Sequence, residues 1–285
     1  MDVYCLIGYP VKHSVSRYMH NAAFQHLGID ASYVHFSIKP ENLKKGIEAL
    51  KLLDIKGFNV TLPHKESVLR FLDELAEEAK LIGAVNTVVK KDERLIGYNT
   101  DAKGFIIPLK EKTSVKGKVA LVMGAGGSAK AVSYILLKEK IGKIFIANRT
   151  LERAKKLSSS LKKLGKETEV KVLALDEIKT IIKEVDILIN TTPVGMFPGV
   201  ESCIIDESLL RKLNKDAIVY DLVYNPLETK LLKLSKKFNL ETISGIEMLV
   251  HQAALAFEIW TSKKAPVDVM KKAAVNALNL FSKNK

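Results

Sequence analysis

One stretch decides the fold of this chain, Val119-Ala120-Leu121-Val122-Met123-Gly124-Ala125-Gly126-Gly127-Ser128. Its five apolar residues predict a buried strand, and the glycines after them predict a tight turn into a helix. Such a turn lets a pyrophosphate approach the amides at the helix N-terminus, where the helix dipole favours anions. We interpret the turn as a dinucleotide-binding site, and a turn that only packs tightly is the alternative. The residues expected to contact the cofactor here are Gly124, Ala125, Gly126, Gly127 and Ser128.

The end of the next predicted strand, residues 144–148, bears on which dinucleotide binds. An acidic residue there would hydrogen-bond the ribose hydroxyls of NAD and repel a 2′-phosphate. The sequence has instead Asn148, Arg149 and Thr150, followed by Arg153, which offer guanidinium and hydroxyl donors to a phosphate. We therefore predict NADP as the cofactor. The alternative is that Asn148 and Thr150 cap a helix and that the arginines lie on its surface.

Short strand-like runs alternate with helical patterns on both sides of this stretch, which is typical of βαβ units with parallel sheets. From residue 119 onward the pattern predicts a doubly wound nucleotide-binding fold with strands at 119–123, 144–148, 170–175, 187–190 and 218–221. In the N-terminal part we predict strands at 3–8, 32–38, 57–61, 84–90 and 95–99. Two helical patterns follow near the C-terminus, at 247–262 and 267–282.

The length and the order of these elements predict an α/β protein of two domains, since 285 residues exceed the usual size of one, about 150 residues. An N-terminal α/β domain that binds substrate would comprise residues 1–103, and a Rossmann-like domain residues 104–239. Residues 240–285 would form helices that return to the substrate domain. We expect a cleft between the two lobes.

The composition excludes several classes of protein. With 47% hydrophobic and 27% charged residues, the chain is neither collagen-like, nor of low complexity, nor wholly disordered. Its first residues lack a basic stretch followed by a long apolar one, so we predict no secretory signal and no membrane span, and expect a cytoplasmic protein. Two distant cysteines, Cys5 and Cys203, predict neither a disulfide framework nor a cysteine-based metal site.

The formal net charge of +13 raises the question of nucleic-acid binding. Most of the excess falls in residues 106–235, where lysines are scattered over amphipathic segments instead of forming basic runs interleaved with aromatic residues. We interpret these lysines as solvated helix faces and predict no nucleic-acid partner. A basic protein that associates with nucleic acid is a minor alternative.

Polar residues follow several strands of the N-terminal part. Ser14 and Ser16, in the loop after the first strand, can cap a helix or bind a carboxylate. Pro63 can begin a helix and would place Lys65 in its first turn, where the positive helix end disfavours an ammonium group. Asp101, after another strand, can supply a carboxylate that favours the ammonium again, so the pair suits proton transfer. A surface lysine and a helix cap are the alternatives.

Three further polar residues have ordinary structural explanations. Asn86 interrupts the strand predicted at 84–90, where a buried amide needs a hydrogen-bond partner. Gln252 lies among apolar residues at helical spacing and would usually pack helices together, and Tyr224 before Pro226 can be a turn aromatic. Spacing alone does not show that these groups converge.

Taken together, these segments resemble the shikimate dehydrogenase family over nearly the whole chain. The combination is more specific than any one stretch. The resemblance implies the reversible, NADPH-dependent reduction of 3-dehydroshikimate to shikimate, on the pathway to chorismate and the aromatic amino acids, without a metal. It rests on residues 8–21, 59–65, 83–87, 99–101, 124–128, 148–150, 190–192, Gly195, Met196, 221–226, Thr229 and 248–253.

The resemblance also implies roles for individual residues. Lys65 would be the acid/base group, with Asp101 paired to it and binding substrate hydroxyls. The substrate carboxylate would be held by Ser14, Ser16 and Tyr224, and the ring hydroxyls by Asn59, Thr61, Asn86 and Gln252. Near the nicotinamide would lie Thr192, Leu222 and Gly245, and Glu77 stands where the family sometimes shows a cofactor contact. Hydride transfer at a secondary alcohol must be accompanied by proton transfer at its oxygen, which suits these assignments.

Three residues depart from the family pattern: Arg17 stands where Pro is frequent, Ser244 where Asp is frequent and Glu247 where Gly is frequent. Ser244 and Glu247 flank the expected nicotinamide end, so they bear on cofactor preference and rate. Two other interpretations stay open, a broader quinate/shikimate dehydrogenase that uses NAD and a non-catalytic nucleotide or metabolite sensor on the same fold. We expect a monomer or a homodimer with a small-molecule substrate.

Overall fold

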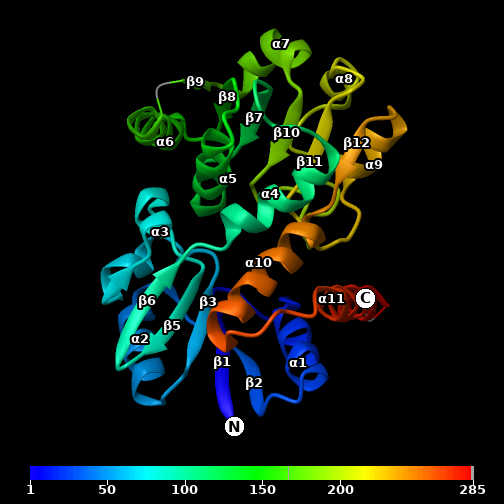
Figure 1. Ribbon diagram of the computed structural model, residues 1–285. Coiled ribbons are helices and arrows are strands. Elements are labelled where there is room, and N and C mark those ends of the chain that lie inside the picture. The colour runs from blue at the N-terminus through cyan, green and yellow to red at the C-terminus, as the bar shows by residue number, and fades with distance from the viewer. Residues whose placement is uncertain (166, 284–285) are drawn as a thin grey trace. The chain divides into compact units, whose positions relative to one another are not determined.

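The computed structural model describes residues 1–165 and 167–283. The chain divides into two compact units, which can be followed by colour in Figure 1. The first unit comprises Met1–Gly104 and Val250–Lys285, and the second comprises Phe105–Leu249. The divisions fall inside helices α4 (Asp101–Lys112) and α10 (Gly245–Thr261).

The first unit is built on a six-stranded mixed sheet with the strand order β2-β1-β3-β5-β6-β4. The pairs β2-β1, β1-β3 and β4-β6 are parallel, whereas β5 runs antiparallel to both β3 and β6. The strands are β1 (Asp2–Gly8), β2 (Ala31–Ser37), β3 (Gly57–Val60), β4 (Glu74–Leu75), β5 (Thr87–Lys91) and β6 (Arg94–Tyr98).

The expectation of parallel sheets throughout is wrong for this unit. Strands β5 and β6 form a hairpin whose two-residue turn, Asp92 and Glu93, has positive φ at both residues, 48° and 63°. Such a turn matches the twist of antiparallel strands, and a connection this short is too short for a crossover to a parallel strand. The sheet is therefore mixed.

An apolar core lies between this sheet and helices that pack against it. Cys5, Ile7, Phe58, Val60 and Val88 supply the strand side of the core. Helix α1 packs against α11, so the C-terminal helix is part of the first unit. The helices wholly within the unit are α1 (Ser16–His26), α2 (Leu43–Leu52), α3 (Glu77–Ile82) and α11 (Val267–Lys283), together with the 3-10 helices η1 (Pro40–Asn42) and η2 (Ser67–Phe71).

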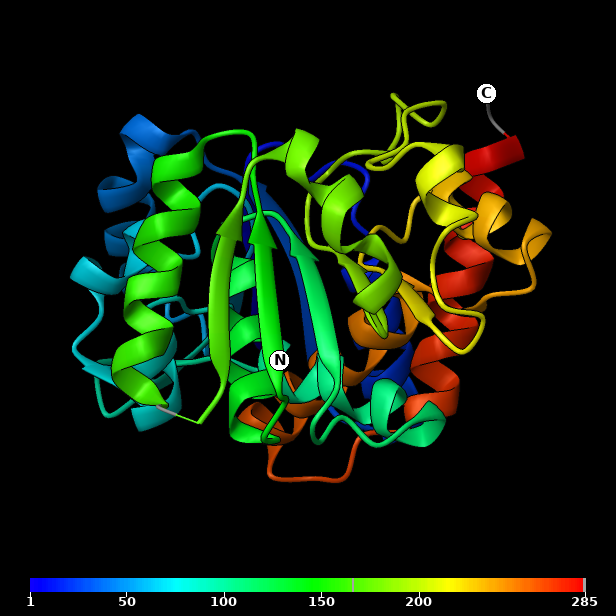
Figure 2. The ribbon, with the colours of Figure 1, turned by 90° about the horizontal axis from the view of Figure 1, so that it is seen from above.

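The second unit contains a six-stranded, entirely parallel sheet with the order β12-β11-β10-β7-β8-β9. The order reverses between β7 and β10, as in doubly wound dinucleotide-binding folds, which confirms the predicted fold class. The neighbouring strands β7, β8 and β9 can be followed side by side in Figure 2. The strands are β7 (Val119–Met123), β8 (Lys143–Ala147), β9 (Glu169–Leu173), β10 (Ile187–Asn190), β11 (Ile218–Asp221) and β12 (Glu241–Ile243).

Fully buried strand residues such as Leu121, Phe145, Leu188 and Val219 form the core of this sheet, because a parallel sheet covered on both faces needs continuous apolar strands. The helices are α5 (Gly127–Lys138), α6 (Leu151–Leu164), α7 (Ile178–Ile181), α8 (Glu207–Leu210) and α9 (Lys230–Lys237), with the 3-10 helices η3 (Leu175–Glu177) and η4 (Ile182–Glu184). Within the described part of the chain, no helix is long and apolar enough to cross a bilayer.

Candidate active site

The two predicted acid/base residues form a buried ion pair in the first unit. Lys65 Nζ donates to Asp101 Oδ2 at 2.5 Å, and the two side chains are only 12% and 4% exposed. Asp101 is the first residue of α4, and Asn99 caps this helix by accepting a hydrogen bond from the Ala102 amide at 3.2 Å. A short contact between ammonium and carboxylate, with little access for water, holds the amine in one place.

The prediction that Pro63 begins a helix with Lys65 in its first turn is wrong. The His64 amide donates to the Thr61 carbonyl at 2.9 Å, which closes a four-residue turn with Pro63 inside it. The helical segment that follows, η2, begins only at Ser67. The His64 ring donates through Nε2 to the carbonyl of Ile38 at 2.7 Å and so anchors the turn next to the end of β2. The electrostatic partner of Lys65 is therefore the Asp101 carboxylate and not a helix end.

Asn86 holds the other oxygen of the Asp101 carboxylate. It precedes β5 by one residue, so the prediction that it interrupts a strand is wrong. Its Nδ2 lies 2.8 Å from Asp101 Oδ1 and 3.1 Å from Gln252 Oε1, and its Oδ1 accepts from the Thr100 amide at 2.7 Å. Asn86 thereby joins the ion pair to Gln252 of α10, and it leaves Asp101 Oδ2 to Lys65.

Asn59 is tied to protein atoms through both ends of its amide. Its Nδ2 donates to the Asn86 carbonyl at 3.1 Å and to Thr87 Oγ1 at 3.0 Å, and its Oδ1 accepts from the Tyr33 hydroxyl at 2.7 Å. Because an amide nitrogen carries two hydrogens, these bonds use both, which leaves Oδ1 as the only atom of this amide with hydrogen-bonding capacity to spare, as an acceptor. Tyr33 is not among the residues predicted from the sequence; the signal available was a tyrosine on a predicted strand, whose hydroxyl needs a partner when buried.

Ser14, Ser16 and Thr61 follow the carboxyl ends of two paired parallel strands, β1 and β3. Ser14 Oγ donates to Ser16 Oγ at 3.1 Å and accepts from the Ser16 amide at 3.3 Å, so the two serines are joined at the start of α1. The Thr61 amide donates to the Ile7 carbonyl at 2.9 Å, which extends the strand pairing by one residue. These hydroxyls therefore lie at one edge of the sheet.

The glycine turn of the second unit fits a dinucleotide. Gly124 has φ of +116°, and a Cβ on it would overlap Thr191 Oγ1, so only glycine suits this position. A Cβ on Gly126 would meet nothing within 4 Å, so open space lies before α5, which begins at Gly127. The turn lies between β7 and β10, where the strand order reverses and ligands of such folds collect. Free space at a helix N-terminus is what a pyrophosphate requires.

The residues predicted to bind the 2′-phosphate follow the neighbouring strand, β8. The side chain of Asn148 donates to the Thr150 carbonyl at 2.8 Å, whereas Thr150 makes no side-chain cap of α6. The side chains of Arg149 and Arg153 are exposed. The structure thus leaves two guanidinium groups at the surface, that of Arg149 just after β8 and that of Arg153 in the first turn of α6, and β8 is the neighbour of β7, which the glycine turn follows.

The residues predicted near the nicotinamide follow the ends of β10, β11 and β12. Thr192 Oγ1 donates to Asn190 Oδ1 at 2.7 Å, and a Cβ on Gly245 would overlap the Leu222 carbonyl, so Leu222 and Gly245 are in close contact. Ser244, one of the departures, donates to the Leu227 carbonyl at 3.0 Å and so fastens the loop after β11. Tyr224 belongs to this loop of the second unit, whereas Glu77 is an exposed residue at the start of α3 in the first unit.

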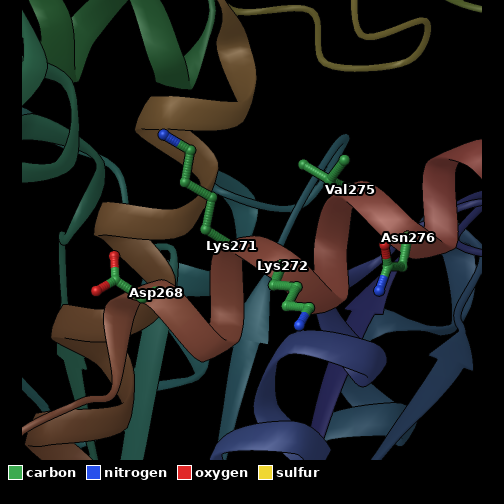
Figure 3. Close-up of a pocket in the computed structure, with 5 residues that line it drawn as sticks. All are labelled: Asp268, Lys271, Lys272, Val275 and Asn276. Carbon is green, nitrogen blue, oxygen red and sulfur yellow. The ribbon is translucent and has the colours of Figure 1, made fainter.

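The predicted site residues neither form a metal site nor line the surface hollow on α11. Across residues 1–165 and 167–283, no group of three or more His, Cys, Asp or Glu side chains could hold a metal ion. The hollow, of about 300 Å³, is shown in Figure 3, and none of the predicted site residues lines it. It is lined by Asp268, Lys271, Lys272, Val275 and Asn276.

Comparisons with known proteins cover both units. Family models match residues 6–88 (shikimate dehydrogenase substrate binding domain), 108–223 (shikimate/quinate 5-dehydrogenase) and 245–275 (shikimate 5′-dehydrogenase C-terminal domain). A shikimate dehydrogenase (NADP(+)) of Methanobrevibacter smithii is 48% identical over 96% of each chain. The chain belongs to the shikimate dehydrogenase family.

Two solved structures of shikimate dehydrogenases are similar over the whole fold. One, in complex with NADP+, is 45% identical with a TM-score of 0.91 and covers 98% of this chain and 96% of its own. Another, from Thermus thermophilus in complex with NADP(H) and shikimate, is 34% identical with a TM-score of 0.86 and covers 97% of this chain and 100% of its own. The resemblance inferred from the sequence is thereby confirmed.

Proposed function

We propose that this member of the family is an NADP-dependent shikimate dehydrogenase, which reduces 3-dehydroshikimate reversibly to shikimate. The observation that carries the proposal is the buried Lys65–Asp101 ion pair, surrounded by uncharged hydrogen-bonding side chains, in the unit that matches the substrate-binding domain. A rigid polyol is bound through several oriented donors and acceptors, and a carbonyl reduction needs one group that delivers a proton.

Lys65 is the proposed proton donor and acceptor. Bound NADPH supplies the hydride to the carbonyl carbon. In reduction the Lys65 ammonium delivers a proton to the carbonyl oxygen, and in the reverse direction the neutral amine takes a proton from the hydroxyl. Asp101 Oδ2 holds the amine at 2.5 Å, and Asn86 fixes the opposite carboxylate oxygen at 2.8 Å. Asp101 thus orients the amine, and it also accepts a hydrogen bond from a substrate hydroxyl.

We assign the remaining polar residues to substrate binding as the family implies. Hydroxyl donors suit a carboxylate, whereas amides serve as both donors and acceptors toward hydroxyls. The carboxylate would be held by Ser14, Ser16 and Tyr224, and the ring hydroxyls by Asn59, Thr61, Asn86 and Gln252. For Asn59 we propose acceptance through Oδ1, because its two amide hydrogens already have protein partners.

The second unit is the proposed NADP-binding domain, and the first unit is the proposed substrate domain. The open glycine turn before α5 would take the pyrophosphate, and the exposed Arg149 and Arg153 would take the 2′-phosphate. An exposed guanidinium and the absence of an acidic residue at positions 148–150 favour NADP over NAD. We propose Thr192, Leu222 and Gly245 for the nicotinamide side, and Glu77 as a peripheral cofactor contact.

We further propose shikimate as the small-molecule partner, no nucleic-acid partner, and a monomer or homodimer. The scattered lysines support the absence of a nucleic-acid partner, since many of them pair with acidic neighbours, such as Lys143 with Glu169 and Glu184.

The test is the absorbance of the reduced nicotinamide after mixing the protein with shikimate plus NADP, shikimate plus NAD, and quinate plus each cofactor. We expect strong activity with shikimate and NADP only. Comparable activity with quinate or NAD would favour the broader quinate/shikimate dehydrogenase, and folded protein that is inactive in every mixture would favour a non-catalytic sensor.

A further inference from the structure

The second unit contains a buried carboxylate to which the proposed reaction gives no role. Asp221 is the last residue of β11 and is 0% exposed. It is the cross-strand partner of Asn190, the last residue of β10. The pair therefore stands where two central strands end, at the edge of the sheet from which the loops with Thr192 and Leu222 depart.

Three separate segments of the chain donate hydrogen bonds to the Asp221 carboxylate. Oδ1 accepts from Asn190 Nδ2 at 2.9 Å and from the Val223 amide at 3.0 Å, and Oδ2 accepts from Thr229 Oγ1 at 2.6 Å. The donors belong to the end of β10, to the loop after β11 and to the residue that precedes α9. One side chain thus joins both strand exits to the next helix.

Asn190 passes the orientation of the carboxylate on to the loop after β10. Its Nδ2 faces Asp221, so its Oδ1 is turned outward and accepts from the Thr192 amide at 3.0 Å and the Thr192 hydroxyl at 2.7 Å. A flipped amide would place its NH₂ group against the two Thr192 donors and its oxygen against the carboxylate. The Asp221 carboxylate, together with the Val194 carbonyl that accepts from Asn190 Nδ2 at 3.1 Å, therefore selects the amide orientation that holds Thr192.

Burial raises the pKa of Asp221 to about 6, while the hydrogen bonds from Thr229, Val223 and Asn190 act in the opposite direction. All three donors are neutral, so they satisfy the charge without cancelling it. Burial of an ionised group held by neutral donors opposes folding, and residues of this kind cluster at functional sites.

We propose that Asp221 is a positioning residue for the nicotinamide end of the cofactor, which it serves by holding the loops that carry Thr192 and Leu222. The inference rests on the proposed function, because the roles of Thr192 and Leu222 follow from the family. In this role Asp221 contacts neither the substrate nor the cofactor, and it acts through Asn190, Val223 and Thr229.

The experiment compares two ligands that share the adenosine half. NADPH carries the nicotinamide, and adenosine 2′,5′-bisphosphate lacks it. Affinities of both are measured by titration calorimetry for the unchanged protein and for Asp221→Ala, whose fold is checked by circular dichroism. We expect the affinity for NADPH to fall about tenfold or more and that for adenosine 2′,5′-bisphosphate to stay within about twofold, with kcat for shikimate falling about 100-fold, as expected for displaced reacting groups.

A graded series keeps the test decisive if the alanine variant does not fold. In Asp221→Asn the amide oxygen can still accept from Asn190 and Val223, but the Thr229 hydroxyl then loses its acceptor. Thr229→Val removes that donor from the ionised carboxylate, and Thr229→Ser keeps it. We expect Asp221→Asn and Thr229→Val to lower the affinity for NADPH but not that for adenosine 2′,5′-bisphosphate. We expect Thr229→Ser to keep the NADPH affinity of the unchanged protein. The matched control is Ser235→Ala, since Ser235 is a buried α9 residue whose hydroxyl donates to the Leu231 carbonyl at 2.8 Å.

The inference is overturned if folded Asp221 variants keep NADPH affinity and kcat within about twofold of the unchanged protein. It is also overturned if both ligands weaken equally, or if Ser235→Ala behaves like Thr229→Val, because either result indicates general damage to the unit. Failure of the proposed function gives a different result, namely no oxidation of shikimate by the unchanged protein. The ratio of the two affinities does not depend on shikimate and decides the role of Asp221 in that case as well.

Discussion

Each unit of the molecule buries a carboxylate at a strand end or helix start, but the two carboxylates have different partners. Asp101 of the first unit contacts the ammonium of Lys65 at 2.5 Å, whereas Asp221 of the second unit accepts hydrogen bonds from neutral groups of three segments. A carboxylate paired with an amine holds a group that exchanges protons. A carboxylate held by neutral donors fixes backbone and amide orientations. The difference separates residues suited to chemistry from residues suited to positioning.

The largest effect is expected at the ion pair. Lys65→Ala removes the group that delivers the proton, so kcat should fall by about 10³ to 10⁴, at the upper end for general acid–base catalysis. Binding of NADPH should stay unchanged, because the glycine turn and its strand exits belong to the second unit. Steady-state kinetics and NADPH titration check both points. Exposed Lys80 of α3 offers a control, since Lys80→Ala should retain full activity; near-normal turnover by the Lys65 variant would refute the acid/base assignment.

The next effect is the pH dependence of stability that Asp221 confers. Its folded pKa of about 6 exceeds the ordinary value of 3.8, so between these values the folded state binds more protons than the unfolded state. The free energy of unfolding should therefore fall as pH rises from about 4 to 6, by about 3 kcal/mol from this group. Asp221→Asn should lack this fall. Urea unfolding of both proteins at several pH values between 4 and 7 measures it, and parallel curves would contradict the raised pKa.

His20 should give a dependence of the opposite sign in the first unit. Burial, with the positive charge of His35 as a smaller cause, lowers the pKa of His20 to about 3. The unfolded chain then binds the proton more strongly, so stability is present above pH 6.5 and is lost as pH falls toward 3. At pH 5 the loss from this group is about 2 kcal/mol. His20 stacks on Tyr33 with ring centroids 4.3 Å apart, and His20→Phe can keep that packing.

Urea unfolding at pH 5 and pH 7 tests this second dependence. His20→Phe should lose less stability between pH 7 and pH 5 than the unchanged protein, whereas His26→Gln, which alters an exposed ring at the end of α1, should lose as much. Equal losses in all three proteins would show that the His20 ring does not titrate as its burial implies.

The smallest of these effects is expected at the cofactor's phosphate. Arg149→Ala removes one exposed guanidinium, so KM for NADP should rise about tenfold, the worth of one charge-assisted hydrogen bond at a surface. KM for NAD and kcat with shikimate should stay as they are. Initial rates with both cofactors measure the change, and an equal rise for NAD and NADP would place Arg149 away from the 2′-phosphate.

Several features followed from local sequence. The apolar run 119–123 with its glycines predicted the turn between β7 and α5, because hydrophobic periodicity and turn chemistry act over a few residues. The hairpin of β5 and β6 was missed because its turn is Asp92-Glu93, without the glycine that usually marks such turns. The helix start predicted at Pro63 was wrong because a proline suits a turn as well as the first residue of a helix.

The order of residues along the chain was enough to predict the alternation of strands and helices, the dinucleotide turn and the polar residues at strand ends, and the family pattern added their roles. Which of these residues meet became visible only in the folded molecule. Lys65 and Asp101 are 36 positions apart, Asn86 and Gln252 are 166 apart, and Asn190 and Asp221 are 31 apart. Each contact depends on strand order and register, which arise from packing of the whole sheet, and spacing along the chain carries no information about them.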